Sequence, residues 1–525
     1  MESTSRLSPD PLTLRTTGKG RRLVSNTAIN VLQSPTALLI QLFLTPYILG
    51  TLGRSAYGIW TLTASVLSYL PQLQAGLNSS VNYQVPRRHH DGDLAGINSV
   101  VSTIFAFYVA MAAAGAGVIA LVVWKFPVWF SVPDDLVAVS RIVIALVGVA
   151  TLVTLVTSVF SGVLTGLQRY DITAGSRVGF LLARATAIVL SLSLGAGLVG
   201  LASAAGAVQV LTAVWVVYAA YKVLPGLRVG RSAVDFALLP GMLLYSTSTL
   251  MYTSGQLLVS QASKVLVGLL LTPADVADFA VPFVLVSMVG NFVFAMTVAT
   301  KPMTTLLRAE EEEDKIRRLY FLSTKYAVLV ALPAAASFLL FGDEILGAWV
   351  GRSYHGPGGL LLAILAIPQL LRVSQLAGYS VVTGLGEHRY FGLSVLIQAV
   401  SGLVLAFVLA RYFGLGLVGV AIGISVPELI GSGFFIPRYC CRVIGVRVGD
   451  MIRGSVVPAM TASIPVVLYL VAARFRIPID SRTSLISMFG GALAIWGVSA
   501  WLLALGRGEK ELVSRRGAEI FSSGR

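Results

Sequence analysis

The stretch VLTGLQRYD at residues 163–171 recurs as VVTGLGEHRYF at residues 381–391. Between the two copies, the TGL triplet is shifted by 218 positions and the Arg-Tyr pair by 220 positions. Each copy directly follows a long apolar run and precedes another one. A motif that recurs at one long period in the same context predicts an internal duplication.

A second pair of stretches supports the same period. LGRSAYGIW begins at Leu52, and LTPADVADFAV begins at Leu271, a shift of 219 positions. Both stretches join the first two apolar runs of their half. The sequence therefore predicts two six-helix halves of the same orientation, related by an axis along the membrane normal, with the substrate between them.

The composition indicates a polytopic membrane protein. The 525 residues are 56% hydrophobic and 12% charged, and the mean hydropathy is +0.81. Soluble domains carry about 25% charged residues. Because the apolar runs are continuous rather than alternating, they favour helices over a β-barrel.

Fourteen transmembrane helices are expected, in two six-helix bundles followed by two further helices. The expected spans lie near residues 24–49, 55–82, 97–124, 136–165, 174–194, 199–221, 237–270, 276–300, 319–341, 358–383, 391–410, 417–437, 454–472 and 484–505. The expected parts are a cytoplasmic basic tail (1–23), an N-terminal bundle (24–222), a C-terminal bundle (237–441), helices 13 and 14 (454–505) and a cytoplasmic tail (506–525).

The basic residues predict the orientation. Lys and Arg concentrate in the segments that lie inside when the N-terminus is inside, so both termini are expected in the cytoplasm. This placement accounts for the net charge of +15 without nucleic acid as a partner. The neighbouring Cys440 and Cys441 and the scattered histidines predict neither a disulfide framework nor a metal site.

Polar side chains form stripes along several expected spans. In the seventh span, Tyr252, Gln256, Ser260 and Lys264 follow one another at steps of four. Such stripes are typical of a water-filled cavity, and hydrogen bonding between packed helices is the alternative. The candidate cavity residues of neutral type are Asn30, Gln33, Gln72, Tyr252, Gln256 and Gln375.

Two arginines lie deep in apolar runs, Arg184 in FLLARATAIVL (180–190) and Arg372 in AIPQLLRVSQL (366–376). A charge at the bilayer centre costs about 2.5–3.5 kcal/mol on insertion scales, so both are expected to line a pathway. A structural hydrogen bond to backbone carbonyls is the alternative. Arg141, Arg177 and Lys325 lie nearer to helix ends, where snorkelling is expected.

The expected cavity is cationic, because Arg184, Arg372 and the shallower Lys264 face few acids. Only Glu428 lies clearly within a span. Guanidinium groups match phosphate or diphosphate, and hydroxyl and amide groups match sugars. Glu428 is expected to pair with a cation or to couple transport to Na⁺ or H⁺, and a purely structural role stays open. No other cofactor is expected.

These residues resemble the polysaccharide (O-antigen or exopolysaccharide repeat-unit) flippases of the multidrug/oligosaccharidyl-lipid/polysaccharide exporter superfamily. The resemblance covers the length, the six-plus-six-plus-two division, LGRSAYGIW at 52–60, QAGLNSSVNYQ at 74–84 and Pro302. It implies a V-shaped pair of bundles around a positively charged cavity. Relatives often carry an acid in the seventh helix near Ser263 and Lys264, so this chain departs from the pattern there.

The resemblance implies that the chain turns a polyprenyl-diphosphate-linked oligosaccharide from the inner to the outer leaflet of a bacterial inner (plasma) membrane. The other expectations are a monomer, contacts with membrane lipids, and a polysaccharide polymerase or glycosyltransferase as partner. Three other functions stay open: a cation or drug antiporter, a flippase for a peptidoglycan precursor, and an enzyme acting on the same lipid. No catalytic residue is assigned, so an enzyme is not expected.

Overall fold

The computed structural model describes residues 18–244, 247–351, 357–476, 482–506 and 508–511, and for some helical residues, among them 18–34, only the backbone. In these ranges the chain is helical without a β-strand. Twelve of the described helices are long and apolar enough to cross a membrane. The protein is an all-α polytopic membrane protein, as predicted.

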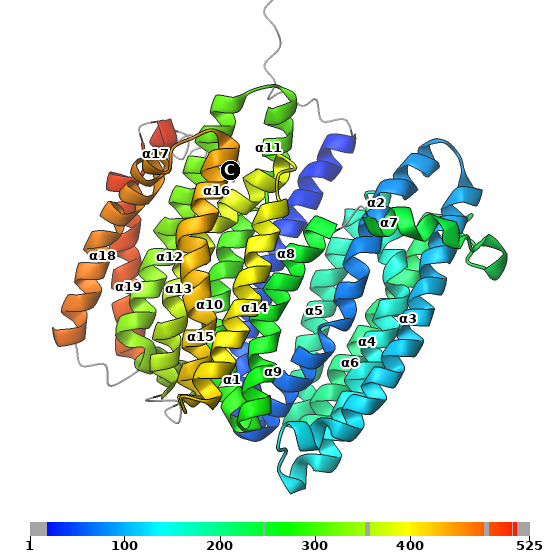
Figure 1. Cartoon of the computed structure of the whole chain (residues 1–525), viewed down its shortest axis with the longest axis horizontal. Coiled ribbons are helices and arrows are strands. Elements are labelled where there is room, and N and C mark those ends of the chain that lie inside the picture. Colours follow the sequence, from blue (N-terminus) through cyan, green and yellow to red (C-terminus); the bar gives the residue numbers. More distant parts are fainter. Residues whose placement is uncertain (1–17, 245–246, 352–356, 477–481, 507, 512–525) are drawn as a thin grey trace, which may run out of the picture.

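The helices form two lobes that lie side by side and diverge toward the end where α1 begins (Figure 1). α1 lies between the lobes and packs against α5 on one side and α10 on the other. The N-lobe contains α1 (Gly18–Leu67), η1 (Leu70–Gln74), α2 (Ala75–His90), α3 (Leu94–Trp129), η2 (Asp134–Leu136), α4 (Val137–Gly166), α5 (Tyr170–Ser193) and α6 (Gly197–Val223).

The C-lobe follows a connection that holds η3 (Arg231–Ala233) and η4 (Phe236–Leu238). Two further helices, α18 and α19, pack on its outer side next to α12 (Figure 1). α7 (Leu239–Leu244) packs against α2 of the N-lobe (Figure 1). The C-lobe contains α8 (Thr247–Leu257), the π-helical η5 (Leu258–Ala262), α9 (Ser263–Leu270), α10 (Pro273–Thr297), α11 (Thr300–Ala309), α12 (Glu313–Val350), α13 (Pro357–Gly384), α14 (Arg389–Arg411), α15 (Gly416–Ile430), η7 (Gly431–Phe435) and α16 (Ile436–Ile444). The last elements are α17 (Val448–Met451), η8 (Ile452–Val456), α18 (Val457–Arg476), α19 (Arg482–Ser499) and η9 (Ala500–Ala504).

The expected helix boundaries differ from the structure at the first two spans. α1 is continuous to Leu67 except at Gly53, whose φ of 77° and ψ of 173° break the helix into two. Only glycine adopts this region easily, so Gly53 makes the turn between the first and second spans. The second span then extends to His90 through η1, which contains Pro71. Residues 18–23, expected in the tail, belong to α1.

The seventh expected span is not one regular helix. α7, α8, η5 and α9 follow one another over residues 239–270, and η5 is a π-helical turn. Residues 245 and 246 lie outside the described residues, and this segment is not among the twelve candidate spans. α1 counts once although Gly53 divides it. The number fourteen therefore stays a prediction.

The two TGL turns have the same backbone conformation. Gln168 has a φ of 56° and Gly386 has a φ of 78°, so both lie in the left-handed region at the end of a helix. In both copies the amide of the residue after this left-handed position donates to the carbonyl five residues before it, as in a Schellman motif. These two hydrogen bonds, Arg169 to Leu164 and Glu387 to Val382, both measure 3.0 Å.

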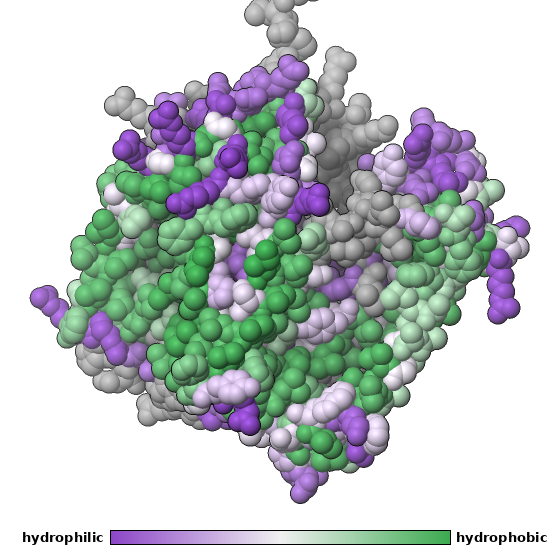
Figure 2. Space-filling view, viewed as in Figure 1, coloured by the Kyte–Doolittle hydropathy of each residue, from purple (hydrophilic) through white to green (hydrophobic). Residues whose placement is uncertain are grey.

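The surface pattern agrees with a protein that spans a membrane. Hydrophobic residues cover the flanks of both lobes, and hydrophilic residues gather at the two ends and in the furrow between the lobes (Figure 2). Exposed apolar side chains on the flanks include Phe43, Leu211 and Leu468. Burial of such a surface in lipid rather than in protein is what distinguishes this chain from a soluble bundle.

The C-terminal segment is attached to α12 by a buried ion pair. The Lys325 ammonium lies 2.8 Å from the Glu509 carboxylate, and the Tyr326 hydroxyl donates to the same group at 2.7 Å. Burial alone would raise the pKa of Glu509, but hydrogen bonds from Lys325, Tyr326 and the Gly506 amide outweigh it and lower the pKa below its ordinary value.

Acid is therefore expected to release the segment that holds Glu509. Because the pKa of this group is lower in the folded protein, its stabilisation is complete above the ordinary glutamate pKa of about 4.3 and is lost as the pH falls through the lower folded value. Amide hydrogen exchange over residues 506–511, corrected for its intrinsic pH dependence, should accelerate only in acid. In Glu509→Gln it should be fast throughout, and equal protection of both proteins would contradict the expectation.

Candidate functional site

Four adjoining hollows run from inside the N-lobe, past α1, to the inside of the C-lobe. Their volumes are about 540, 320, 460 and 20 Å³. Neighbouring hollows share lining residues: Arg184 lines the first and second, Gln41 the second and third, and Arg372 the third and fourth. We call them the N-lobe pocket, the α1–α5 pocket, the inter-lobe pocket and the C-lobe recess.

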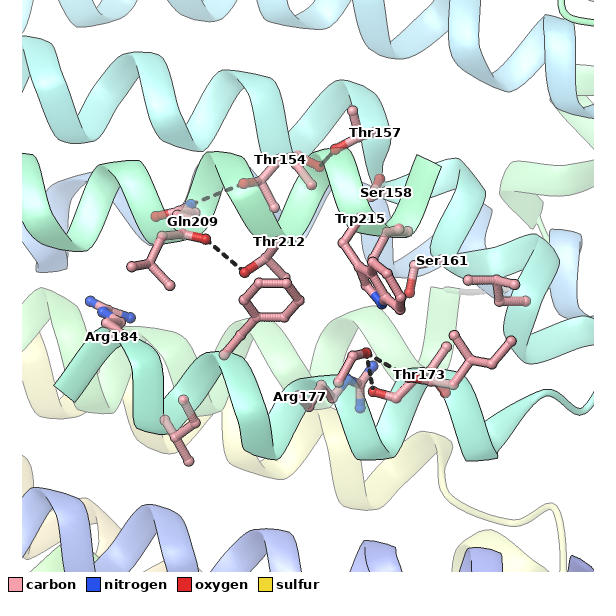
Figure 3. A pocket seen from close by; sticks show the side chains of 18 of the residues that line it. Thr154, Thr157, Ser158, Ser161, Thr173, Arg177, Arg184, Gln209, Thr212 and Trp215 are labelled. Atoms are coloured by element: carbon pink, nitrogen blue, oxygen red, sulfur yellow. Dashed lines mark hydrogen bonds between the residues drawn. The ribbon is translucent and has the colours of Figure 1, made fainter. Parts of the chain in front are cut away.

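The N-lobe pocket lies between α4, α5 and α6 and has a polar wall (Figure 3). Gln209 of α6 donates to the Thr154 hydroxyl of α4 at 3.1 Å, which joins the two helices at one side of the pocket. α5 contributes two arginines, Arg184 near Gln209 and Arg177 near Thr173. The remaining polar lining consists of Gln74, Asn78, Thr157, Ser158, Ser161, Ser176 and Thr212.

Arg184 has an exposed side chain and no hydrogen bond or ion pair with any other described residue. It lies at the junction of the N-lobe pocket and the largely apolar α1–α5 pocket, which α1 and α5 line with residues such as Leu44 and Ile188. A guanidinium group that is not neutralised by the protein can take its counter-ion from a ligand.

The inter-lobe pocket contains the polar stripe predicted for the seventh span. Tyr252, Gln256, Ser260 and Lys264 all line it, together with Gln72 from the N-lobe. The Lys264 ammonium donates to Gln261 Oε1 at 3.3 Å and lies 5.3 Å from the centre of the Phe283 ring. The π-helical turn η5 belongs to this wall, in keeping with the frequent occurrence of π-helical turns at functional sites.

Arg372 of α13 is surrounded by acceptors. Its guanidinium lies 3.0 Å from Glu428 Oε1 of α15, and it donates to Gln256 at 2.7 Å and to Gln369 at 2.8 and 2.5 Å. Glu428 Oε1 accepts no hydrogen bond from a described residue, so the ion pair neutralises the carboxylate without saturating it. The sequence analysis left this pairing open as one of the roles of Glu428.

The remaining predicted residues occupy different places. Gln375 lines the C-lobe recess, where its amide nitrogen donates to the Ser374 hydroxyl at 2.9 Å. The side chains of Asn30 and Gln33 lie outside the described residues. Tyr252 is stacked on Tyr379 with 3.8 Å between ring centres, so only part of its surface faces the pocket.

Snorkelling was predicted for both Arg177 and Lys325, and the structure places both differently: Lys325 is buried in the ion pair with Glu509. The place of Arg177 near the start of α5 predicted snorkelling, whereas its side chain lines the N-lobe pocket. The signal was present, because Arg177 and Arg184 are seven residues apart and therefore share a helix face. With Lys264 and Arg372 they make four cations along the described lining of the hollows, against one carboxylate, Glu428.

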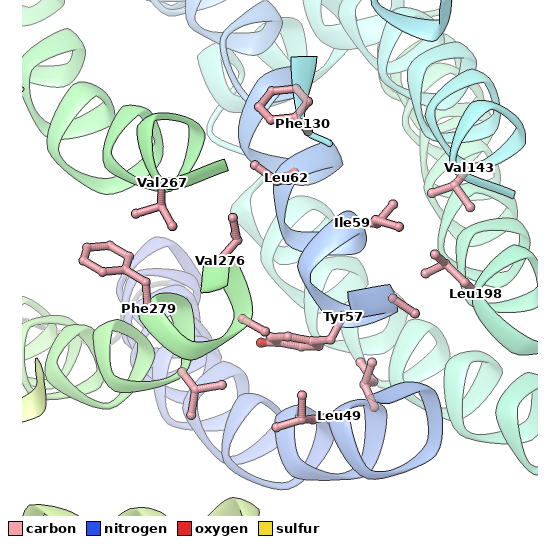
Figure 4. Close-up of a cluster of buried hydrophobic side chains, with 14 of the residues drawn as sticks. Leu49, Tyr57, Ile59, Leu62, Phe130, Val143, Leu198, Val267, Val276 and Phe279 are labelled. Carbon is pink, nitrogen blue, oxygen red and sulfur yellow. The ribbon is translucent and has the colours of Figure 1, made fainter. Parts of the chain in front are cut away.

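The lobes meet at the end of the hollow opposite the start of α1. Tyr57, Ile59 and Leu62 of α1 pack in one apolar core with Val276 and Phe279 of α10 (Figure 4). Polar contacts reinforce this closure: Ser65 donates to Gln261 Oε1 at 2.9 Å, and Arg54 lies 3.5 Å from Asp278. At the other end, each lobe has a separate core.

Comparisons with known proteins agree with this architecture. No family profile matches the chain. A curated protein of Bacillus subtilis, described as the uncharacterized membrane protein EpsK, is 24% identical over 499 residues, which cover 93% of this chain and 97% of EpsK. A structure described as the inward-facing conformation of a multidrug resistance MATE family transporter of the MOP superfamily has a TM-score of 0.63 at 17% identity, covering 79% of this chain and 98% of that one.

The chain has the fold of the MOP superfamily. A MOP superfamily transporter from Pyrococcus furiosus, described as having a binding pocket of reverse polarity, aligns with a TM-score of 0.57 at 16% identity over 82% of this chain and 96% of its own. The fold that the sequence resemblance implies is thereby confirmed. In this MOP fold the hollows described above lie within and between the two lobes.

Proposed function

We propose that the protein is a flippase that carries a polyprenyl-diphosphate-linked oligosaccharide from the inner to the outer leaflet by alternating access. The observation that carries the proposal is Arg184, a deep cation at a pocket junction without a described counter-ion. A diphosphate supplies that counter-ion, and the hydroxyl and amide lining suits a glycan. The fold shared with MATE transporters and the LGRSAYGIW motif also support a transport role, and the match to EpsK along nearly the whole chain supports a membrane protein.

The conformation fits the first step of such a cycle. The lobes are closed at one end by the shared core and diverge at the end where α1 begins (Figure 1). With the orientation that the basic residues predict, the hollow faces the cytoplasm and is ready for a substrate made there. The structure also aligns better with the structure described as inward-facing than with one described as the outward-facing conformation of a MATE family transporter, with TM-scores of 0.63 and 0.55.

A cation or drug antiporter is the second candidate, because the structural relatives include multidrug resistance transporters. A site for a cation needs an available carboxylate. The one carboxylate that lines the described hollows, Glu428, lies 3.0 Å from Arg372 and is neutralised by it. The charge of the hollow therefore favours an anionic substrate. Na⁺ or H⁺ coupling through Glu428 remains part of the proposal and requires the ion pair with Arg372 to open during the cycle.

Purified protein in vesicles should move a fluorescent polyprenyl-diphosphate disaccharide between leaflets, and Arg184→Ala should slow this movement. Loss of a charged hydrogen bond, worth about 1.5–3 kcal/mol, corresponds to roughly 10- to 150-fold. Accessibility of the sugar to a membrane-impermeant reagent measures the rate. Arg141→Ala, an exposed arginine of α4 outside the hollows, is the matched control. Vesicles that export a cationic dye and leave the lipid in place would support the antiporter instead.

A further inference from the structure

Arg177 is a second cation in the N-lobe pocket that has no partner of its own. Its side chain is exposed into the pocket, and it forms no hydrogen bond or ion pair with another described residue. No carboxylate occurs in the described lining of this pocket. The protein therefore places a second guanidinium where an anion would stabilise it.

This second cation lies away from the position available to the diphosphate. Arg177 and Arg184 are two helical turns apart on one face of α5, or roughly 10 Å along the helix axis. The diphosphate carries the lipid chain, so it stays at the Arg184 end, where the pocket joins the apolar α1–α5 pocket. Arg177 lies nearer the start of α5 and lines the N-lobe pocket without reaching the α1–α5 pocket, so the glycan is the part of the substrate placed beside it.

The surroundings of Arg177 suit a sugar ring. Ser161 and Thr173 line the same end of the pocket, and the Trp215 ring faces into it from α6 (Figure 3). Hydroxyl groups both donate and accept hydrogen bonds, and an indole ring presents a broad apolar face with one polar N–H group. This combination can hold a sugar face and leave an anionic substituent to the guanidinium.

Resting on the proposed flippase function, we propose that Arg177 binds a carboxylate on the second sugar of the glycan. The substrate class is then an acidic oligosaccharide, with the charged sugar one unit removed from the diphosphate-linked sugar. A guanidinium can bind a carboxylate through two parallel hydrogen bonds, which an uncharged hydroxymethyl group at the same position cannot replace. Arg177 thus determines specificity, while Arg184 serves the part common to all such lipids.

Two synthetic probes test the assignment: polyprenyl-diphosphate disaccharides that differ only in the second sugar, glucose or glucuronic acid. Binding to the purified full-length protein is measured by displacement of a labelled polyprenyl diphosphate. The parent should bind the acidic probe about tenfold to a hundredfold more tightly than the neutral one, as expected for one charged hydrogen-bonded pair. Arg177→Gln should lose this preference with unchanged affinity for the neutral probe, and Arg177→Lys should retain part of it.

Arg141→Gln, on neighbouring α4, controls for the loss of one positive charge from the lobe. The melting temperature of Arg177→Gln should equal that of the parent, because the side chain is exposed and unpaired. Equal binding of both probes by the parent would overturn the assignment. If Arg177→Gln weakened the binding of both probes equally, the assignment would also be overturned, because the diphosphate would then lie beside Arg177. If the unsubstituted protein bound neither probe, the proposed flippase function would be overturned together with the assignment of Arg177. This outcome separates a failure of the function from a failure of the assignment alone.

Discussion

Replacing Gly58 by valine is expected to abolish transport and to leave the closed end of the hollow open. Gly58 lies in LGRSAYGIW and contacts the backbone of Pro273, where the second half of the chain begins its matching turn. A Cβ atom at position 58 would overlap the Pro273 carbonyl group. Because that group is backbone and not a flexible side chain, the two lobes must separate; overpacking of this kind typically costs about 1–3 kcal/mol.

Separation of the lobes at the closed end can be detected with a single cysteine in place of Ser287, which lines the inter-lobe pocket. In a background without Cys440 and Cys441, a membrane-impermeant thiol reagent added outside should label Ser287→Cys only when Gly58→Val is also present. Gly50→Val is the matched control, since a Cβ atom added at Gly50 meets no atom within 4 Å. Parental flipping by Gly58→Val, or unchanged labelling, would contradict the role given to this contact.

The repeat explains why the fold could be predicted from the sequence and why this contact could not. The TGL and RY matches locate equivalent helix ends, and Gln168 and Gly386 indeed share one backbone conformation. Local patterns report such turns because the hydrogen bonds that define them are local. The contact between Gly58 and Pro273 joins the two halves across the molecule, and no short-range pattern encodes which copies touch.

The sequence predicts how deep the arginines of the candidate site lie in the membrane, but it does not predict which residues they pair with. Apolar flanks show that Arg184 and Arg372 are deep, because depth depends only on position along a helix. The partner of Arg372 depends on how α13 and α15 are rotated about their axes, so the ion pair with Glu428 could be left only as an alternative. Arg177 shares a face of α5 with Arg184 and lines the N-lobe pocket, although its position near a helix end is typical of snorkelling.

Removal of Arg372 is expected to destabilise the protein more than removal of its partner Glu428. The Glu428 side chain is 12% exposed and the Arg372 side chain is 26% exposed. Arg372→Met therefore leaves the more buried charge without a counter-ion, at a cost of about 3–5 kcal/mol. Glu428→Gln leaves a cation that still reaches the hollow and keeps its hydrogen bonds to Gln256 and Gln369. It should lower the melting temperature less.

The double variant Arg372→Met/Glu428→Leu separates a structural role of this pair from a role in binding. With both charges removed no buried charge is left unpaired, so its melting temperature should return toward the parental value, because replacing a whole buried pair by apolar residues is often neutral. If Arg372 also contacts the diphosphate, the stable double variant should still bind the labelled polyprenyl diphosphate at least tenfold more weakly, the loss expected for one charged hydrogen bond. Parental affinity in a restored double variant would make the pair purely structural. An additive loss of stability would mean that the two charges are not coupled, against their 3.0 Å separation.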